Sequence, residues 1–176
     1  MIDVIYSILF ILPAYVANAA PVILGGKNSI DFNKKFFDKQ YIFGPGKTID
    51  GFIGGILAGT TTSIILAKLL IRTNLDIFAS NALMYIQIGF ILSLGAMIGD
   101  LLGSFIKRRL EIKRGKPVFI LDQLDFLSVA LAGAYLFGFR YVFEIENLIF
   151  LVSLTIFIHK FANLLAFMLK LKKHPW

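Results

Sequence analysis

The chain has 176 residues, of which 57% are hydrophobic and 16% are charged, so its composition excludes an ordinary soluble domain, in which roughly 25% of residues are charged. Eighteen basic against eleven acidic residues give a net charge of +7, and at a mean hydropathy of +0.78 this excess indicates basic loops at a membrane surface rather than nucleic-acid binding. There is no cysteine, which excludes disulfides and thiolate chemistry.

Five segments of the sequence are long and apolar enough to cross a bilayer, which takes about 20 residues as a helix. They are residues 2–24, 50–71, 78–102, 118–139 and 146–169. No basic residue precedes the first segment, which argues against a cleaved signal peptide. We therefore expect a single all-α integral membrane domain, residues 1–176, with five transmembrane helices.

Basic residues are distributed unequally among the segments that join these helices. Fourteen lysines and arginines fall within residues 25–49, 103–117 and 170–176, whereas the connections 72–77 and 140–145 hold one each. Cytoplasmic loops carry an excess of Lys and Arg. We therefore expect two basic cytoplasmic loops, a cytoplasmic C-terminus and an outside N-terminus in a multi-pass protein of the cell membrane.

Small residues recur at every fourth position on the second and third expected helices. The two seams are Gly51, Gly55, Gly59 and Ser63, and Gly95, Gly99 and Gly103. This spacing lets helix backbones approach closely in lipid. We expect the two seams to pack together and to bring residues 44–48 next to Asp100.

A charged stretch begins where the third expected helix ends. The residues that share one helical face are Asp100, Ser104, Lys107 and Arg108. Asp122 and Asp125 follow, three residues apart. Carboxylates beside cations are typical of a site for a divalent metal and phosphate, so we expect Asp100, Asp122 and Asp125 to bind Mg²⁺. The alternative is that the cations anchor the helix at the interface and pair with the acids.

The segment Gly44-Pro45-Gly46-Lys47-Thr48 directly precedes the second expected helix. Glycine backbone allows a phosphate to approach closely, and a helix N-terminus favours an anion. The first glycine of a P-loop is absent at the required spacing. By itself the segment is a weak signal, because Pro-Gly before a helix is usually an ordinary turn.

Together these motifs resemble a known enzyme family. Residues 43–55 look like the P-G-K-T-x-x-G-F-x-G-G segment of bacterial phosphatidate cytidylyltransferases, and residues 104–108 match the opening S-x-[LIVMF]-K-R of their signature. Lys113 fits its next lysine, and residues 122–125 resemble its closing D-R-x-D. Gln123 in place of the arginine, a missing H-G-G and a shorter chain are similar to the archaeal branch, the CDP-archaeol synthases.

The resemblance implies an activity, a set of site residues and a set of partners. CMP passes from CTP to a lipid phosphate, which in the archaeal branch is the ether-linked, unsaturated archaetidic acid, and pyrophosphate is released with Mg²⁺ as cofactor. The implied catalytic residues are Asp100, Lys107, Asp122 and Asp125. The implied nucleotide-binding residues are Gly46, Lys47, Thr48, Ser104, Arg108 and Lys113. The implied partners are CTP, the lipid phosphate and the bilayer, without nucleic acid; a homodimer is left open.

Other functions stay open at this point. They are a phosphatidate cytidylyltransferase that acts on ester lipids, a lipid-phosphate-binding subunit without turnover, and a small membrane transporter, although transporter charges cluster nearer the bilayer midplane. A CDP-alcohol phosphotransferase is disfavoured because its D-x-x-D-G-x-x-A-R motif is absent. His159 lies within the fifth expected helix. It either makes a helix–helix hydrogen bond or contacts the lipid phosphate.

Overall fold

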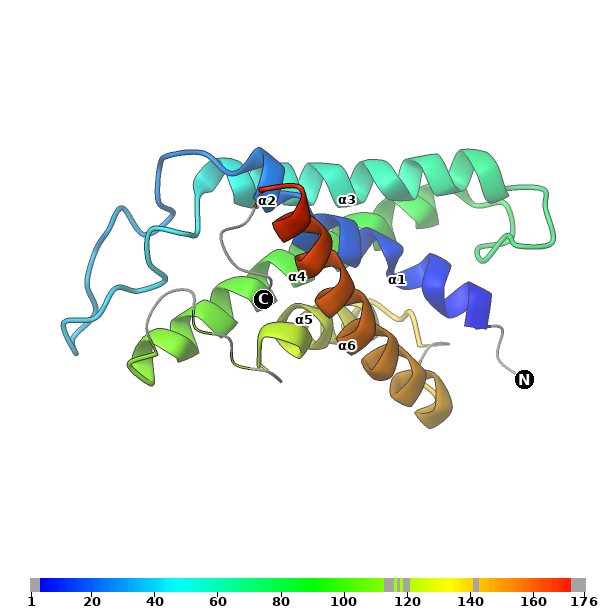
Figure 1. Ribbon diagram of the computed structural model, residues 1–176. Helices are drawn as coiled ribbons and strands as arrows, with labels where there is room; N and C mark the ends of the chain where they lie inside the picture. The colour runs from blue at the N-terminus through cyan, green and yellow to red at the C-terminus, as the bar shows by residue number, and fades with distance from the viewer. Residues whose placement is uncertain (1–3, 113–115, 117, 119–120, 141–142, 172–176) are drawn as a thin grey trace.

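The computed structural model describes residues 4–112, 116, 118, 121–140 and 143–171. Its helices are α1 (Val4–Ala19), α2 (Pro21–Leu24), α3 (Ile49–Leu70), α4 (Ala82–Arg109), α5 (Leu121–Leu136) and α6 (Ile145–Met168). Figure 1 shows α3 and α4 as long neighbouring rods, with α6 crossing the bundle on the side of α1 and α5. The predicted all-α membrane fold is confirmed.

Four segments of the described chain are long and apolar enough to cross a membrane. They are Val4–Leu24, Ile49–Leu70, Ala82–Arg109 and Ile145–Met168. The fifth long helix, α5, has only 16 residues and begins with an acidic turn. The sequence predicts a complete span over residues 118–139, whereas α5 ends at Leu136, because Gly138 has a φ of +89° and the helix does not continue through it. The apolar residues after Leu136 therefore lengthen the hydrophobic stretch without lengthening the helix.

The central helix is α4, which packs against α1, α3 and α5. Its buried face carries Tyr85, Ile88, Leu92 and Ala96, each at most 2% exposed. Asn81 caps its start, since the Asn81 side chain accepts a hydrogen bond from the Met84 N–H. At the other end α4 continues to Arg109, seven residues beyond the predicted end at 102, so one rigid helix carries both Asp100 and Lys107.

The glycine seam of α3 faces α1 and α4. A Cβ added at Gly55 would lie 2.8 Å from the Ala17 carbonyl oxygen and against Met97, and one at Gly59 would lie 3.0 Å from the Ala17 Cβ and against Ser93. Only residues without a side chain allow this approach. The seam therefore fixes the start of α3, and with it the 44–48 segment, beside α4.

The glycine seam of α4 faces α5 instead. A Cβ at Gly95 would lie 2.6 Å from the Ala130 Cα, and one at Gly99 would lie 2.7 Å from the Phe126 Cα. The prediction that the two seams pack against each other is therefore wrong. Each seam does admit a close helix contact, but the partners differ because α4 presents one face to α3 and another to α5.

The loop between α2 and α3 is organised around Asp31, which is buried. Its carboxylate accepts hydrogen bonds from the backbone N–H groups of Asn33 at 3.0 Å, Phe43 at 2.9 Å and Gly44 at 2.8 Å, and from the Ser29 hydroxyl. Burial acts to raise the pKa of Asp31, but these hydrogen bonds outweigh it and the pKa lies below its usual value. Asp31 therefore closes the loop that leads to Lys47.

Candidate active site

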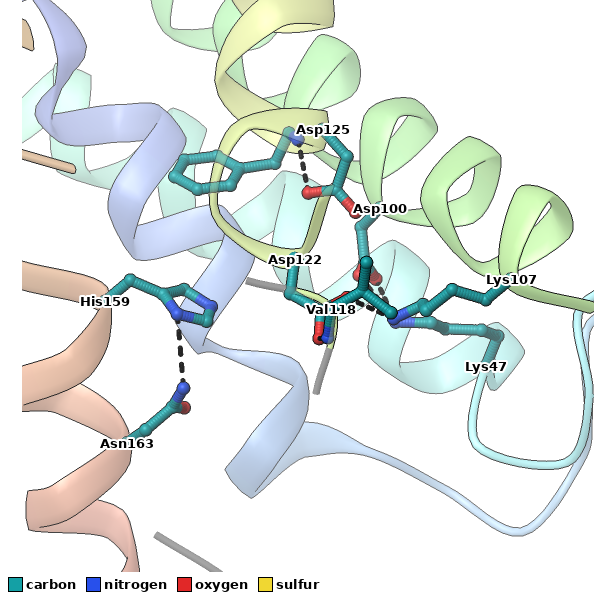
Figure 2. A network of polar contacts seen from close by, with 9 residues as sticks. Lys47, Asp100, Lys107, Val118, Asp122, Asp125, His159 and Asn163 are labelled. Carbon is teal, nitrogen blue, oxygen red and sulfur yellow. Dashed lines mark hydrogen bonds and ion pairs between the residues drawn. The ribbon is translucent and has the colours of Figure 1, made fainter. Parts of the chain in front are cut away.

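Three helix ends meet at one end of the bundle. Lys47 lies two residues before α3, Asp100 and Lys107 lie in the last third of α4, and Asp122 and Asp125 lie in the first turns of α5. Figure 2 shows these side chains converging from the three helices. The structure thus brings together residues from both of the sequence motifs that carry the family resemblance.

Lys47 and Asp100 form the direct contact between the two motifs. The Lys47 Nζ lies 2.6 Å from Asp100 Oδ1 and 2.5 Å from Asp100 Oδ2. The two side chains are 26% and 22% exposed, so the pair is reachable from solvent. The predicted proximity of residues 44–48 and Asp100 is confirmed.

A second ion pair joins the end of α4 to the start of α5. The Lys107 Nζ lies 2.6 Å from Asp122 Oδ1, and Asp122 Oδ2 accepts a hydrogen bond from the Val118 N–H at 3.0 Å. Lys107 and Asp122 are 18% and 23% exposed. Asp122 is therefore fixed in position by its own helix start as well as by Lys107.

Asp125 is placed by the glycine seam of α4. Its carboxylate lies against Gly103, so closely that any Cβ at that position would overlap it. Asp125 Oδ1 accepts the Phe126 N–H at 2.7 Å. The carboxylate interacts electrostatically with Asp100 and with the ammonium groups of Lys47 and Lys107. The three acids and two lysines are thus one connected network.

Thr48 and Gly46 border this network. The Thr48 hydroxyl oxygen accepts hydrogen bonds from the Gly51 N–H at 3.1 Å and the Gly26 N–H at 3.2 Å, which makes it the N-cap of α3. Both residues line a small cavity of about 30 Å³ beside Lys47 and Asp100. Thr48 therefore caps and orients the start of α3 beside Lys47.

The other predicted site residues are on or beyond the end of α4. Ser104 is 4% exposed and lies one turn after Asp100. Arg108 is half-buried in the last turn of the helix. Lys113 lies outside the described residues.

Arg109 is a structural residue of the site that the sequence did not single out. Its guanidinium lies 4.9 Å from the Phe36 ring centroid and 4.6 Å from that of Phe105. It donates to the Tyr41 carbonyl oxygen at 2.7 Å and pairs with Asp38 at 2.6 Å. Arg109 therefore ties the loop before Lys47 to the end of α4. The Lys-Arg-Arg run at 107–109 predicts a basic helix end, but nothing in the sequence predicts that Arg109 binds the loop of Asp38 and Tyr41.

The metal ligands that the site offers are the carboxylate oxygens of its aspartates, and these suit a hard divalent cation. Mg²⁺ prefers oxygen ligands and is usually bound by one or two carboxylates together with phosphates and water. Across the described residues, no three His, Cys, Asp or Glu side chains are grouped to hold a metal unaided. Asp100 and Asp125 interact as like charges, and a cation between them would relieve this repulsion.

The chain is similar in sequence and in fold to known proteins. The family model described as CarS-like, CDP-archaeol synthase, matches residues 1–176. The chain is 43% identical over 173 residues to a CDP-archaeol synthase of Methanocaldococcus jannaschii, covering 97% of this chain and 96% of that one. It is 44% identical over 167 residues to one of Pyrococcus abyssi, covering 95% of each. A solved structure of an intramembrane enzyme for archaeal membrane lipids biosynthesis matches with a TM-score of 0.80 and 33% identity, over 92% of this chain and 94% of that one.

Proposed function

The chain belongs to the CDP-archaeol synthase family of CTP-dependent nucleotidyltransferases, and we propose that it transfers CMP from CTP to an unsaturated archaetidic acid. The observation that carries this proposal is the contact between Lys47 and Asp100, because it joins two distant motifs in one charged site. The products are a CDP-lipid for archaeal membrane lipid biosynthesis and pyrophosphate.

The lipid phosphate acts as the nucleophile in this reaction. Its second pKa is near 6, so it is an anion at neutral pH and needs no general base. One of its oxygens forms a bond to the α-phosphorus of CTP, and the bond from that phosphorus to the oxygen bridging to the β-phosphate breaks, with pyrophosphate taking the electron pair. Catalysis then consists of positioning and charge neutralisation.

The two lysines supply the positive charge from the protein. Lys47 stands at the N-terminus of α3, where backbone N–H groups also favour an anion, and it would bind the triphosphate. Lys107 would neutralise charge near the start of α5. Asp100 and Asp122 hold the two ammonium groups in place before substrate arrives. Ser104, Arg108 and Lys113 are proposed as further contacts to the nucleotide.

Mg²⁺ is the proposed cofactor. Asp100 and Asp125 would hold it together with phosphate oxygens of the substrate, and Asp122 would keep its ion pair with Lys107. When bound, the cation would neutralise the charge that accumulates on the phosphate oxygens.

The proposed orientation places the site in the cytoplasm, where CTP is available. The site lies at the end of the bundle that carries the basic loop between α2 and α3 and the basic end of α4. An excess of Lys and Arg favours the cytoplasmic side. The N-terminus would then lie outside and the C-terminus inside.

The test is turnover of labelled CTP by purified protein with Mg²⁺ and either an ether-linked or an ester-linked lipid phosphate. We expect a CDP-lipid and pyrophosphate, with the ether lipid preferred. We expect Lys47→Ala to lower kcat/KM for CTP by about 100-fold, or roughly 2.7 kcal/mol. Lys34→Ala, on the exposed part of the same loop, should be near wild type and serves as the matched control.

Each alternative function has its own outcome in this assay. Preference for the ester lipid would make the protein a phosphatidate cytidylyltransferase. Lipid binding without a CDP-lipid would make it a binding subunit, and equal loss in both lysine variants would remove Lys47 from the site.

A further inference from the structure

One face of α6 carries a stripe of mostly polar residues at every fourth position. The stripe consists of Asn147, Leu151, Thr155, His159 and Asn163. Its first half packs on α1: the Ser7 hydroxyl donates to Asn147 Oδ1 at 3.3 Å, and the Tyr15 and Thr155 hydroxyls are hydrogen-bonded at 2.7 Å. This half of the stripe is explained by helix packing.

The second half of α6 does not pack in the same way. The buried residues of α6 are Asn147, Leu151 and Thr155, all in its first half. Phe157 is 69% exposed, Leu165 41% and Met168 67%. Of the four candidate spans, α6 has the smallest share of buried residues in its most apolar 18-residue stretch, 11% against 33–50% in the others. The half of α6 that runs toward the charged end of the bundle therefore presents its sides to lipid.

His159 and Asn163 lie in this second half, one turn apart. The Asn163 amide nitrogen and the His159 Nδ1 are hydrogen-bonded at 3.2 Å. Figure 2 shows both side chains projecting from α6 on the side where Asp122 and Asp100 lie. Both are half-buried. With Nδ1 accepting from the amide, the His159 Nε2 carries the proton and is a donor.

Placing polar side chains such as His159 and Asn163 in an apolar membrane helix costs free energy, and such residues commonly mark a functional site. A lipid substrate cannot leave the bilayer, so its phosphate has to reach the Asp–Lys network from the side, past a helix that is loosely packed. The nucleotide, in contrast, arrives from water over the loop that carries Lys47. The stripe on α6 thus continues polar donors along the lipid's route and away from the nucleotide's route.

We propose that His159 and Asn163 bind the phosphate of the lipid substrate as it passes between α6 and the rest of the bundle. This inference rests on the proposed function. The anionic headgroup is held by the Nε2–H of His159 and the amide of Asn163, while its hydrocarbon chains lie along exposed apolar residues such as Phe157 and Leu165. The two residues select the lipid phosphate and position it; the acids and lysines of the network then act on it.

The first experiment separates the two substrates by kinetics in mixed micelles. We expect His159→Ala and Asn163→Ala each to raise KM for an ether-linked dialkylglycerol phosphate about tenfold, as loss of one hydrogen bond to a charged group does, with KM for CTP within about twofold of wild type. His159→Gln retains an N–H donor and should restore most of the lipid affinity. Ser153→Ala, on the exposed side of the same helix, is the matched control.

Equal rises in both KM values, or an unchanged lipid KM, would overturn the inference, because a purely structural role predicts no selectivity for the lipid.

A second measurement works without turnover. The chain has no cysteine, so His159→Cys provides one thiol, which we expect dialkylglycerol phosphate to protect from N-ethylmaleimide while CTP does not. Protection by CTP alone would also overturn the inference. Absence of turnover in the wild-type protein would instead refute the proposed function.

Discussion

At the scale of single residues, the site depends on ion pairs that contribute position more than stability. Lys47–Asp100 and Lys107–Asp122 are each about one-fifth exposed, and partly exposed pairs contribute only about 0–1 kcal/mol. Losing such a pair should leave the fold intact. Asp31 is different, because it is buried and binds three backbone N–H groups.

We therefore predict that Asp31 makes the stability of the protein pH-dependent. Its folded pKa is lowered, so its contribution is present above the unfolded pKa of about 3.9 and is lost as pH falls through the folded value. Asp31→Asn should lower the free energy of unfolding by about 2 kcal/mol at neutral pH. Thermal unfolding between pH 7 and pH 3 measures this effect.

The Asp31→Asn variant should also lose less stability than wild type on acidification. Glu111→Gln, an exposed residue just after α4, is the control and should follow the wild-type curve. Parallel curves for wild type and Asp31→Asn would show that Asp31 does not govern this dependence.

Residues within periodic motifs were predictable, whereas isolated ones were not. Asp100 and Lys107 share a helical face that can be read from spacing, and Lys47 stands in a glycine-rich segment. Asp31 and Arg109 act through a loop whose path is set by tertiary contacts, so no sequence period marks them. The sequence predicts that Thr48 binds nucleotide, and in the structure its hydroxyl also caps the start of α3, a role that its position before a helix would have indicated.

At the scale of helices, small-residue seams predicted close contacts but not the helices that make them. A seam shows only that a backbone can be approached. The seam on α4 receives α5, and the seam on α3 receives α1 together with the Met97 side of α4. Likewise, hydropathy predicted a full span where α5 has 16 residues, because apolar residues beyond the helix end extend the hydrophobic stretch.

The contact between α4 and α5 leads to a prediction about Gly99. A leucine there would meet the α5 backbone near Asp125 and Phe126, which cannot move aside as a flexible side chain can. We expect Gly99→Leu to shift Asp125 away from Asp100 and to lower kcat by about 100-fold or more, since small displacements of positioning groups have effects of this size. CTP turnover by protein that elutes as a single species in detergent measures it.

The matched control for Gly99→Leu is Gly133→Ala in the same pair of helices. The added Cβ would lie 3.2 Å from a methyl group of Ile91, which can give way. Gly133→Ala should therefore keep most of its activity. Wild-type turnover by Gly99→Leu would mean that the spacing of α4 and α5 does not control the site.

At the scale of the whole molecule, the direction of each helix decides which end of the bundle carries the Asp–Lys network and which end carries the two isolated arginines. The helices α3 and α5 start at the site, beside Lys47 and Asp122, so the residues that follow them, Arg72 and Arg140, lie at the far end of the bundle. The helices α4 and α6 run the other way and end near the site. The asymmetry of basic residues in the sequence therefore coincides with an asymmetry in space.

This arrangement predicts that position 35 faces the cytoplasm and position 140 faces outward. Because the chain has no cysteine, Lys35→Cys and Arg140→Cys each carry a single thiol. The Arg140 guanidinium lies 5.1 Å from the Tyr135 ring centroid, and Arg140 is the single basic residue of the connection 140–145. Lys35 belongs to a loop with several other lysines, and Lys-rich loops stay in the cytoplasm. In intact cells, an impermeant maleimide should label Arg140→Cys, and Lys35→Cys should react only after permeabilisation. The opposite labelling pattern would place the Asp–Lys network on the outer surface, away from cytoplasmic CTP, and would require the orientation proposed here to be reversed.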